Sequence, residues 1–273
     1  MSLDEFIIQI KETPHISTVV RKPIIGIIAK HDEKGSLFPE GNQFSFVSDD
    51  LTSAISENGG IPMVIPSINK EITYGNNDSD YNLIPDIEKE NLIALIKMTD
   101  GIILQGGKES DSYEIFVAKY CYDNDIPIIG ICAGQNNLAR AAGGKSRPLT
   151  DNKEKHNSGF NLLAHPITVA KDSKFYKMVD GNSSFRINSI HTNVIDENSL
   201  ENTDLVAVAW DDDGNIEVIE RKDNEKSPYI GIRFHPESLT KDLEVGKIMN
   251  GIFSNFINFC REKKRGVNAI EDR

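Results

Sequence analysis

Short apolar runs alternate with amphipathic helical patterns along the first half of the chain. The runs begin near residues 23, 61, 101 and 127, and a polar turn and a helically spaced segment follow each one. Short runs of continuous apolar residues are typical of strands that are buried on both faces. Strands and helices that alternate in this way predict an α/β domain with a mainly parallel central sheet covered by helices on both faces.

The second half of the chain has shorter strands with a hairpin pattern. Asp213-Gly214 separates two such strands and predicts the turn between them. We expect these strands to form a small antiparallel addition to the parallel sheet. A last apolar strand, Tyr229–Phe234, leads into His235, and an amphipathic helix ending near Cys260 precedes a charged tail.

The chain has 273 residues, of which 38% are hydrophobic, and this is enough for one large α/β domain. No linker rich in Gly, Ser or Pro divides it, so we predict an N-terminal extension over 1–22 and a single domain over 23–273. The polar segment 67–86 shows no periodicity and predicts a long loop. Loops of that length in compact domains are commonly functional or mobile.

The net charge of −12 disfavours nucleic acids and anionic membrane surfaces as partners. No apolar run approaches the roughly 20 residues that span a bilayer, and the N-terminal residues lack the pattern of a signal peptide. Three cysteines in a chain of this length do not form a disulfide framework. These features favour a cytoplasmic protein with reduced thiols.

One cysteine lies at a position that favours reactivity. Cys132 follows the apolar run that starts at Pro127 and precedes a helical pattern, so it falls at a strand-to-helix corner like a nucleophile elbow. A helix N-terminus and a neighbouring histidine both favour the thiolate. Ala133 and Gly134 are small enough for the sharp turn that such a corner needs. Taken alone, Cys132 is as well explained by packing as by catalysis.

His235, Glu237 and a glycine pair supply the other parts of a thiol hydrolase. His235 also ends an apolar strand, so in a parallel sheet it reaches the same edge as Cys132, and Glu237 is placed to orient its imidazole. The backbone N–H groups of Gly107 and Ala133 could form an oxyanion hole, in which one donor typically contributes about 2.7–4 kcal/mol. Together these residues favour catalysis.

Seven segments of the chain resemble motifs of class I glutamine amidotransferase-like hydrolases (peptidase C26), most closely the γ-glutamyl-γ-aminobutyrate hydrolase group. The most specific are the nucleophile segment G-[IV]-C-x-G and the closing H-P-E. The segments are Lys22–Ile27, Ala54–Pro62, Asp100–Gly107, Gly130–Gly134, Asn188–His191, Asp213–Glu217 and Gly231–Glu237.

The resemblance implies a flavodoxin-like three-layer sandwich with a triad of Cys132, His235 and Glu237 that cleaves a γ-glutamyl amide through a thioester. It also implies substrate contacts from several residues near the triad. Relatives usually have C-R-G-[ML]-Q and N-S-x-H-H-Q where this chain has other residues after Cys132 and His191. The γ-aminobutyrate specificity therefore does not carry over. The implied substrate-binding residues are Gly106, Gln135, Asn136, Ser189 and His191.

Other interpretations of function and partners remain open. The chain could be a glutaminase subunit that delivers ammonia to a separate synthase, or a binding protein that kept the fold without turnover; a homodimer is a further option. No nucleotide-binding motif is present and the thiol chemistry requires no cofactor. His156 and His165 lie beside a polar loop without a second pair of ligands at zinc-like spacing, so we predict no metal site.

Overall fold

The structure is a computed structural model that describes residues 21–31, 44–66, 84–107, 112–150 and 152–271. The predicted extension lies outside these residues except for its last two, and so does most of the predicted loop 67–86. Within the described part of the chain, no helix is both long and apolar enough to cross a bilayer.

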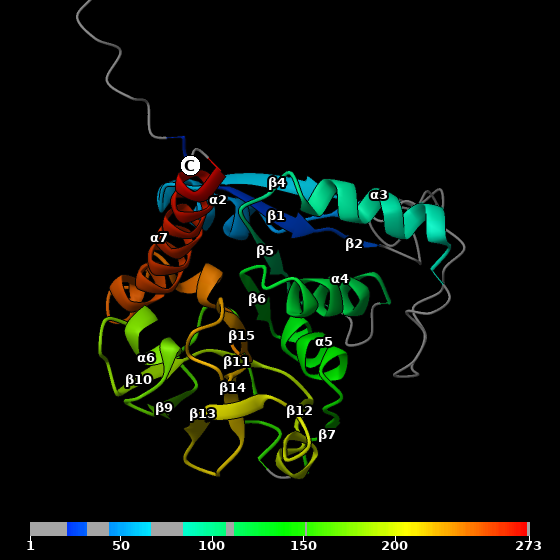
Figure 1. Cartoon of the computed structure of the whole chain (residues 1–273). Coiled ribbons are helices and arrows are strands. Elements are labelled where there is room, and N and C mark those ends of the chain that lie inside the picture. The colour runs from blue at the N-terminus through cyan, green and yellow to red at the C-terminus, as the bar shows by residue number, and fades with distance from the viewer. Residues whose placement is uncertain (1–20, 32–43, 67–83, 108–111, 151, 272–273) are drawn as a thin grey trace, which may run out of the picture.

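A nine-stranded sheet forms the centre of the molecule (Figure 1). Five neighbouring strands run parallel, and the middle three of these are buried along almost their whole length because helices cover both of their faces. In sheet order the five are β4 (Ile61–Ile65), β1 (Ile24–Ile28), β5 (Gly101–Leu104), β6 (Ile128–Ile131) and β15 (Tyr229–Ile232). β4 is the outermost strand, which is where a strand that contains Pro62 is tolerated.

Four antiparallel strands extend the same sheet beyond β15. They are β14 (Ile216–Arg221), β13 (Leu205–Asp211), β9 (His165–Val169) and β10 (Ser184–Ile187). The predicted hairpin turn is present between β13 and β14, and Gly214 has a φ of 82° there. The predicted antiparallel addition is therefore continuous with the parallel sheet, since β14 pairs directly with β15.

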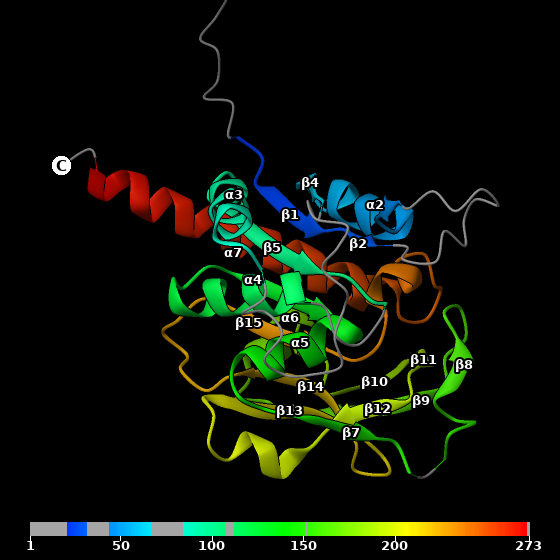
Figure 2. The ribbon, with the colours of Figure 1, turned by 90° about the vertical axis from the view of Figure 1, so that its right-hand side faces the viewer.

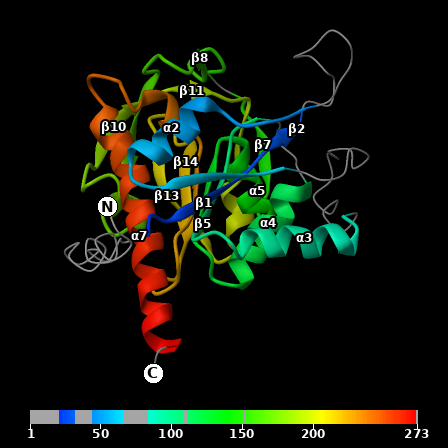
Figure 3. The same ribbon diagram turned by 90° about the horizontal axis from the view of Figure 1, so that it is seen from above.

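Helices cover both faces of the sheet, which confirms the predicted three-layer α/β architecture (Figure 3). One apolar core is formed with α2 (Asp49–Glu57), α6 (Lys174–Met178) and α7 (Gly246–Glu271). The second core lies on the other face with α3 (Asp86–Ile96), α4 (Ser112–Asp123) and α5 (Ala133–Ala141).

The last helix is longer than predicted. α7 continues to Glu271 through the segment that was expected to be a charged tail. Its apolar stripe ends near Cys260, but the Arg, Glu and Lys residues that follow have high helix propensity, and this favours continuation of the helix beyond the core.

Short two-stranded pairs and turns of 3-10 helix lie around the sheet (Figure 2). Two of these segments, around residues 157–160 and 188–190, bring residues from the second half of the chain next to Cys132 and His235. The pairs are β2 (Lys30–His31) with β3 (Ser45–Phe46), β7 (Ser146–Pro148) with β12 (Asn193–Ile195), and β8 (Asn157–Gly159) with β11 (Ser189–Ile190); the 3-10 turns are η2 (Glu197–Leu200) and η3 (Pro236–Leu239).

Candidate active site

Cys132 occupies a strained corner between β6 and α5. Its φ of 53° and ψ of −106° are unusual for a residue with a side chain, and such conformations cost about 1–3 kcal/mol. The backbone is closely packed before and after this corner, at Gly130 and at Gly134. A Cβ at Gly134 would lie 2.6 Å from the carbonyl oxygen of Leu104, so only glycine lets α5 pack directly on β5. The corner therefore presents a partly exposed thiol at the N-terminus of α5.

His235 lies between Cys132 and Glu237. Its Nδ1 donates to Glu237 Oε1 at 2.7 Å, and the ring forms a hydrogen bond with the thiol of Cys132. The ring also packs edge-on against Phe160, with 4.8 Å between ring centroids. Gly106 faces the other side of the imidazole, where a Cβ would collide with His235 Cε1. The structure thus brings the three predicted triad residues together, in the order in which a thiol hydrolase uses them.

The electrostatics of this group favour a thiolate and an imidazolium. Burial acts to raise the pKa of Cys132, but the hydrogen bond from His235, the charges of His235 and Arg233, and the Ala133 N–H lower it below its usual value. Burial acts to lower the pKa of His235, but Glu237 and Cys132 raise it to about 10. An ion pair of this kind is how cysteine hydrolases activate their nucleophile.

Asn188 holds the backbone of His235, and the sequence analysis did not assign it this role. Its Oδ1 accepts from the His235 N–H at 2.9 Å, and its Nδ2 donates to the His235 carbonyl at 3.1 Å and to Ser238 Oγ at 2.9 Å. Asn188 is fully buried. The segment resembling N-S-x-H was the available signal, but the sequence did not show that its first residue reaches the strand end that carries His235.

A cavity of about 420 Å³ opens over the three residues. Cys132, His235 and Glu237 line it together with Gly106 and Gly107. Its outer wall consists of residues that the sequence analysis did not propose, namely Phe46, Ser48, Asp50, Gln105, Phe160, Ile190 and Ser238. The cavity is large enough for a small amide substrate.

A second cavity of about 240 Å³ adjoins Cys132 on the α5 side. Gly107, Ala133, Asn136 and His191 line it, as does Arg233. Arg233 donates to Asn136 Oδ1 at 2.6 Å and to the Cys132 carbonyl at 3.4 Å. Gly107 and Ala133 therefore flank the thiol, where the predicted oxyanion hole would lie, and Asn136 and His191 reach the same space.

Two of the predicted substrate-binding residues point elsewhere. Gln135 is fully buried under the sheet, where its amide donates to the Glu217 carbonyl at 3.1 Å and to the Gly231 carbonyl at 3.3 Å. Ser189 is also buried, and its Oγ lies 3.0 Å from His156 Nδ1. Neither side chain lines the two cavities described above. The prediction failed for both because position next to a motif does not set the direction of a side chain.

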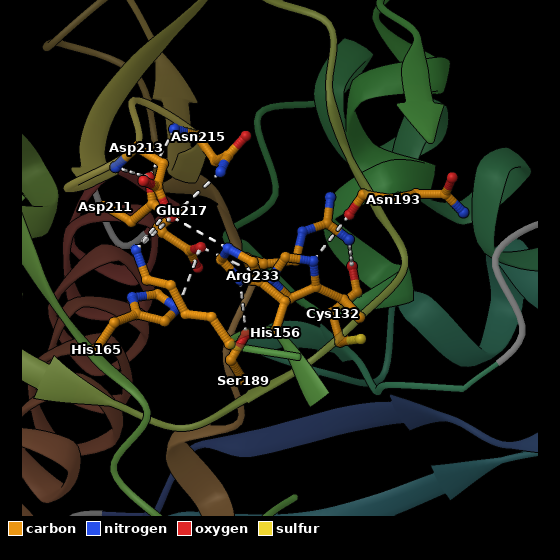
Figure 4. Close-up of polar contacts among 12 residues, drawn as sticks. Cys132, His156, His165, Ser189, Asn193, Asp211, Asp213, Asn215, Glu217 and Arg233 are labelled. Atoms are coloured by element: carbon orange, nitrogen blue, oxygen red, sulfur yellow. Dashed lines mark hydrogen bonds and ion pairs between the residues drawn. The ribbon is translucent and has the colours of Figure 1, made fainter. Parts of the chain in front are cut away.

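A second group of ionisable residues lies beneath this site (Figure 4). We refer to His156, His165, Asp211 and Glu217 as the His–acid cluster; all four are buried, and their ligand-type atoms lie within 4.8 Å of one another. The sequence analysis predicted no metal site from the spacing of His156 and His165. The fold nevertheless places His165, on β9, and His156, in the turn before β8, beside two carboxylates from β13 and β14.

Comparison with known proteins places the chain in a family. The Peptidase C26 family profile matches residues 108–237. Anthranilate synthase component 2 of Cyanophora paradoxa is 30% identical over 202 residues, which cover 65% of this chain and 92% of that protein. The chain belongs to the class I glutamine amidotransferase superfamily. It carries a glutamine amidotransferase-like domain.

Other similarities agree with this assignment. CTP synthase of Pyrococcus horikoshii is 27% identical over 212 residues, which cover 67% of this chain but only 38% of the synthase. The solved structure of a GMP synthase subunit from Thermoplasma acidophilum superposes with a TM-score of 0.59 at 18% identity, covering 91% of this chain and 98% of that one, and supports the fold. The chain thus spans little more than a third of the CTP synthase that it matches.

Proposed function

We propose that this protein hydrolyses γ-glutamyl amides through a γ-glutamyl thioester on Cys132. The Cys132 thiolate attacks the γ-carbonyl carbon, and the C–N bond breaks as His235 donates a proton to the leaving nitrogen. Water then gives a proton to His235 and attacks the thioester, which releases glutamate and restores the thiolate. Glu237 keeps the imidazole oriented, and the N–H groups of Gly107 and Ala133 stabilise the oxyanion.

One observation carries this proposal. A strained, partly exposed cysteine at a helix N-terminus is hydrogen bonded to a histidine, the histidine to a glutamate 2.7 Å away, and all three line one cavity. A packing role would not require a positive φ at Cys132 or a space kept open by Gly106. Cys121 and Cys260 are by contrast buried in the apolar cores, where burial raises the pKa of each thiol well above its usual value.

The residues that line the larger cavity suggest which leaving amine the protein prefers. Phe46, Phe160 and Ile190 give the 420 Å³ cavity an apolar side, and Asp50 places a carboxylate at it. Its described lining has no Lys or Arg that would pair with a carboxylate on the leaving group. We therefore infer a preference for neutral or cationic amines over aminobutyrate, whose free carboxylate would face Asp50.

A glutaminase subunit is the second candidate. It is favoured because the chain covers almost the whole of a solved GMP synthase subunit and of an anthranilate synthase component 2. Such a protein would use the same thioester chemistry, with free glutamine as the substrate and ammonia as the leaving group. It would be expected to turn over weakly on its own and to bind a synthase stably.

Glutamate release from a panel of amides tests these candidates. The panel contains glutamine, a neutral γ-glutamyl alkylamide, a γ-glutamyl diamine and γ-glutamyl-aminobutyrate, each with wild type and Cys132→Ser. We expect the alkylamide and diamine conjugates to be cleaved fastest, and Asp50→Asn to reduce the advantage of the diamine. Cleavage of glutamine alone would favour the glutaminase subunit. No release from any substrate would contradict the free-standing hydrolase.

A further inference from the structure

The His–acid cluster contains buried polar atoms without a hydrogen-bond partner. They include Nε2 of His165 and both carboxylate oxygens of Glu217. The neighbouring His191 has the same property at its Nε2, which lies 3.7 Å from Glu217 Oε1. Two cations lie near these carboxylates: Lys155 Nζ is 3.6 Å from Asp211 Oδ2, and the charge of Arg233 acts on Glu217. Ionised carboxylates are expensive to bury, so a group of this composition favours a further cation within it.

The other nitrogen of each ring fixes which atoms face the centre. Nδ1 of His165 lies 3.2 Å from the Pro166 carbonyl, and Nδ1 of His191 lies 3.1 Å from the Asn193 carbonyl. A carbonyl only accepts, so each Nδ1 carries the proton and each neutral ring directs the lone pair of Nε2 inward. Metal-binding histidines are held in this way by an acceptor at their second nitrogen.

Distances decide between a shared proton and a metal ion. A proton shared between a carboxyl group and an imidazole needs a heavy-atom separation of about 2.5–3.2 Å. Glu217 Oε1 instead lies 4.0 Å from His165 Nε2 and 3.7 Å from His191 Nε2. Two ligands of one tetrahedral zinc, with bonds of about 2.0–2.1 Å, lie about 3.3–3.4 Å apart. The two Glu217 separations are closer to those of metal ligands than to those of a hydrogen bond, whereas His156 Nε2 and Asp211 Oδ2, 3.2 Å apart, lie within hydrogen-bond distance.

We propose that His156, His165, Asp211 and Glu217 bind a divalent transition-metal ion of the zinc type. His156 Nε2 lies 3.2 Å from Asp211 Oδ2, and the four ligand atoms lie within 4.8 Å of one another. Movements of less than ~1 Å per side chain close such a set onto one ion with zinc-like bonds. Two imidazoles and two carboxylates suit zinc, whereas calcium and magnesium prefer oxygen ligands alone.

Outer contacts hold the ligands in place. Asp211 Oδ1 accepts from the N–H groups of Asp213 and Asn215, at 3.0 and 2.7 Å, and this fixes the carboxylate across the turn between β13 and β14. Ser189 Oγ lies 3.0 Å from His156 Nδ1 and orients that ring. Figure 4 shows Asp211 and Glu217 on the hairpin with His165 and His156 facing them. Contacts of this kind orient the ligands in metal sites.

The ion is structural and supports a wall of the candidate active site. The side chains of Glu217 and Asp211 are fully buried, and that of His165 is 2% exposed, so no open position faces solvent. His156 and Ser189 connect the cluster to the paired strands β8 and β11. The same two segments carry Phe160 and Ile190, which line the larger cavity, and Asn188, which holds His235. Binding of the ion would stabilise this wall without contact to substrate.

Metal analysis of the full chain without an affinity tag tests the site. We expect about one zinc per chain after dialysis against a zinc-containing buffer, and binding of Co²⁺ to the chelated protein with the visible absorption of a tetrahedral complex. The chelated protein should melt at a lower temperature and regain its Tm with Zn²⁺. Ser189→Ala should bind about tenfold more weakly, because it removes only an outer contact.

Matched variants make the result specific. Glu217→Gln keeps the size of the side chain but removes the charge, and His165→Ala removes a ligand, so both should lose stoichiometric zinc. His235→Ala removes a histidine outside the cluster and should retain it. Circular dichroism checks that each variant is folded. Absence of zinc and of Co²⁺ bands in the wild type would overturn the proposal. Equal zinc in Glu217→Gln and wild type would overturn it as well, as would a Tm that zinc does not change.

Discussion

The candidate triad and the His–acid cluster are built from similar side chains, but they balance their charges differently. Both ring nitrogens of His235 face a protein group, Glu237 on one side and Cys132 on the other. In the cluster, Nε2 of His165 lies 4.0 Å from Glu217 Oε1, beyond hydrogen-bond distance, and Nε2 of His156 lies 3.2 Å from Asp211 Oδ2. The first group therefore has every part that proton transfer needs, whereas the second has the composition of the metal site that we propose.

Replacement of the thiol should have the largest effect. Cys132→Ser should reduce glutamate release by a factor on the order of 10⁴ or more, because removing the nucleophile of a triad removes its covalent route. Steady-state assays with the best substrate of the panel measure this loss. Cys121→Ala is the control, since Cys121 is buried in α4 away from the cavity. Similar rates for Cys132→Ser and wild type would rule out the thioester.

A methyl group at Gly106 should be the next most damaging change. It would collide with His235 Cε1 and lie 3.4 Å from Cys132 Cβ, so the two residues could not keep their contact. We expect kcat to fall about 10²-fold, which is the typical effect of displacing a catalytic group by about 1 Å. Gly143→Ala is the matched control. An alanine at this position would be strained by the φ of 93°, but its Cβ would meet nothing within 4 Å. It should lose stability and keep kcat.

Removal of the amide that holds His235 should have a smaller effect. Asn188→Ala loses both backbone contacts to His235, and we expect kcat to fall about tenfold with little change in KM, because the base is less well positioned. Asn188→Asp keeps the acceptor for the His235 N–H and should retain more activity than Asn188→Ala. A change confined to KM would show that Asn188 acts on substrate binding instead.

The pH dependence of alkylation gives the finest test of the comparison. A free thiol reacts with iodoacetamide roughly tenfold more slowly for each pH unit below about 8.5. The ion pair with His235 lowers the pKa of Cys132, so its alkylation should remain fast as the pH falls below that point. His235→Ala removes the positive charge and should restore the steep loss of rate. Mass spectrometry of the labelled peptides distinguishes Cys132 from Cys121 and Cys260.

Much of the fold could be predicted from the amino-acid sequence. The apolar runs predicted the parallel strands β1, β5, β6 and β15, and the Asp213-Gly214 pair predicted the β13–β14 hairpin. These elements are local, because each depends on the periodicity of its own residues. The predicted end of α7 was wrong, because the helix propensity of the charged residues extends the helix beyond its apolar stripe.

The candidate active site could be predicted from the sequence only in part. Cys132, His235 and Glu237 follow apolar strands, so their meeting at one edge could be predicted from a parallel sheet. The His–acid cluster could not, since its four residues come from different strands and loops and meet only through the antiparallel register. Gln135 and Ser189 failed for a related reason: burial of their side chains is decided by how α5 and β11 pack, which the sequence does not show.

Trapping the acyl-enzyme tests the central claim most directly. Wild-type protein is mixed with the best substrate of the panel, quenched in acid during turnover and digested. Mass spectrometry then measures the mass of the peptide that contains Cys132. The mechanism predicts the added mass of one γ-glutamyl group on Cys132, absent from Cys132→Ser and removed by hydroxylamine as a thioester would be. Turnover with no adduct at Cys132, or with an adduct on a different residue, would contradict it.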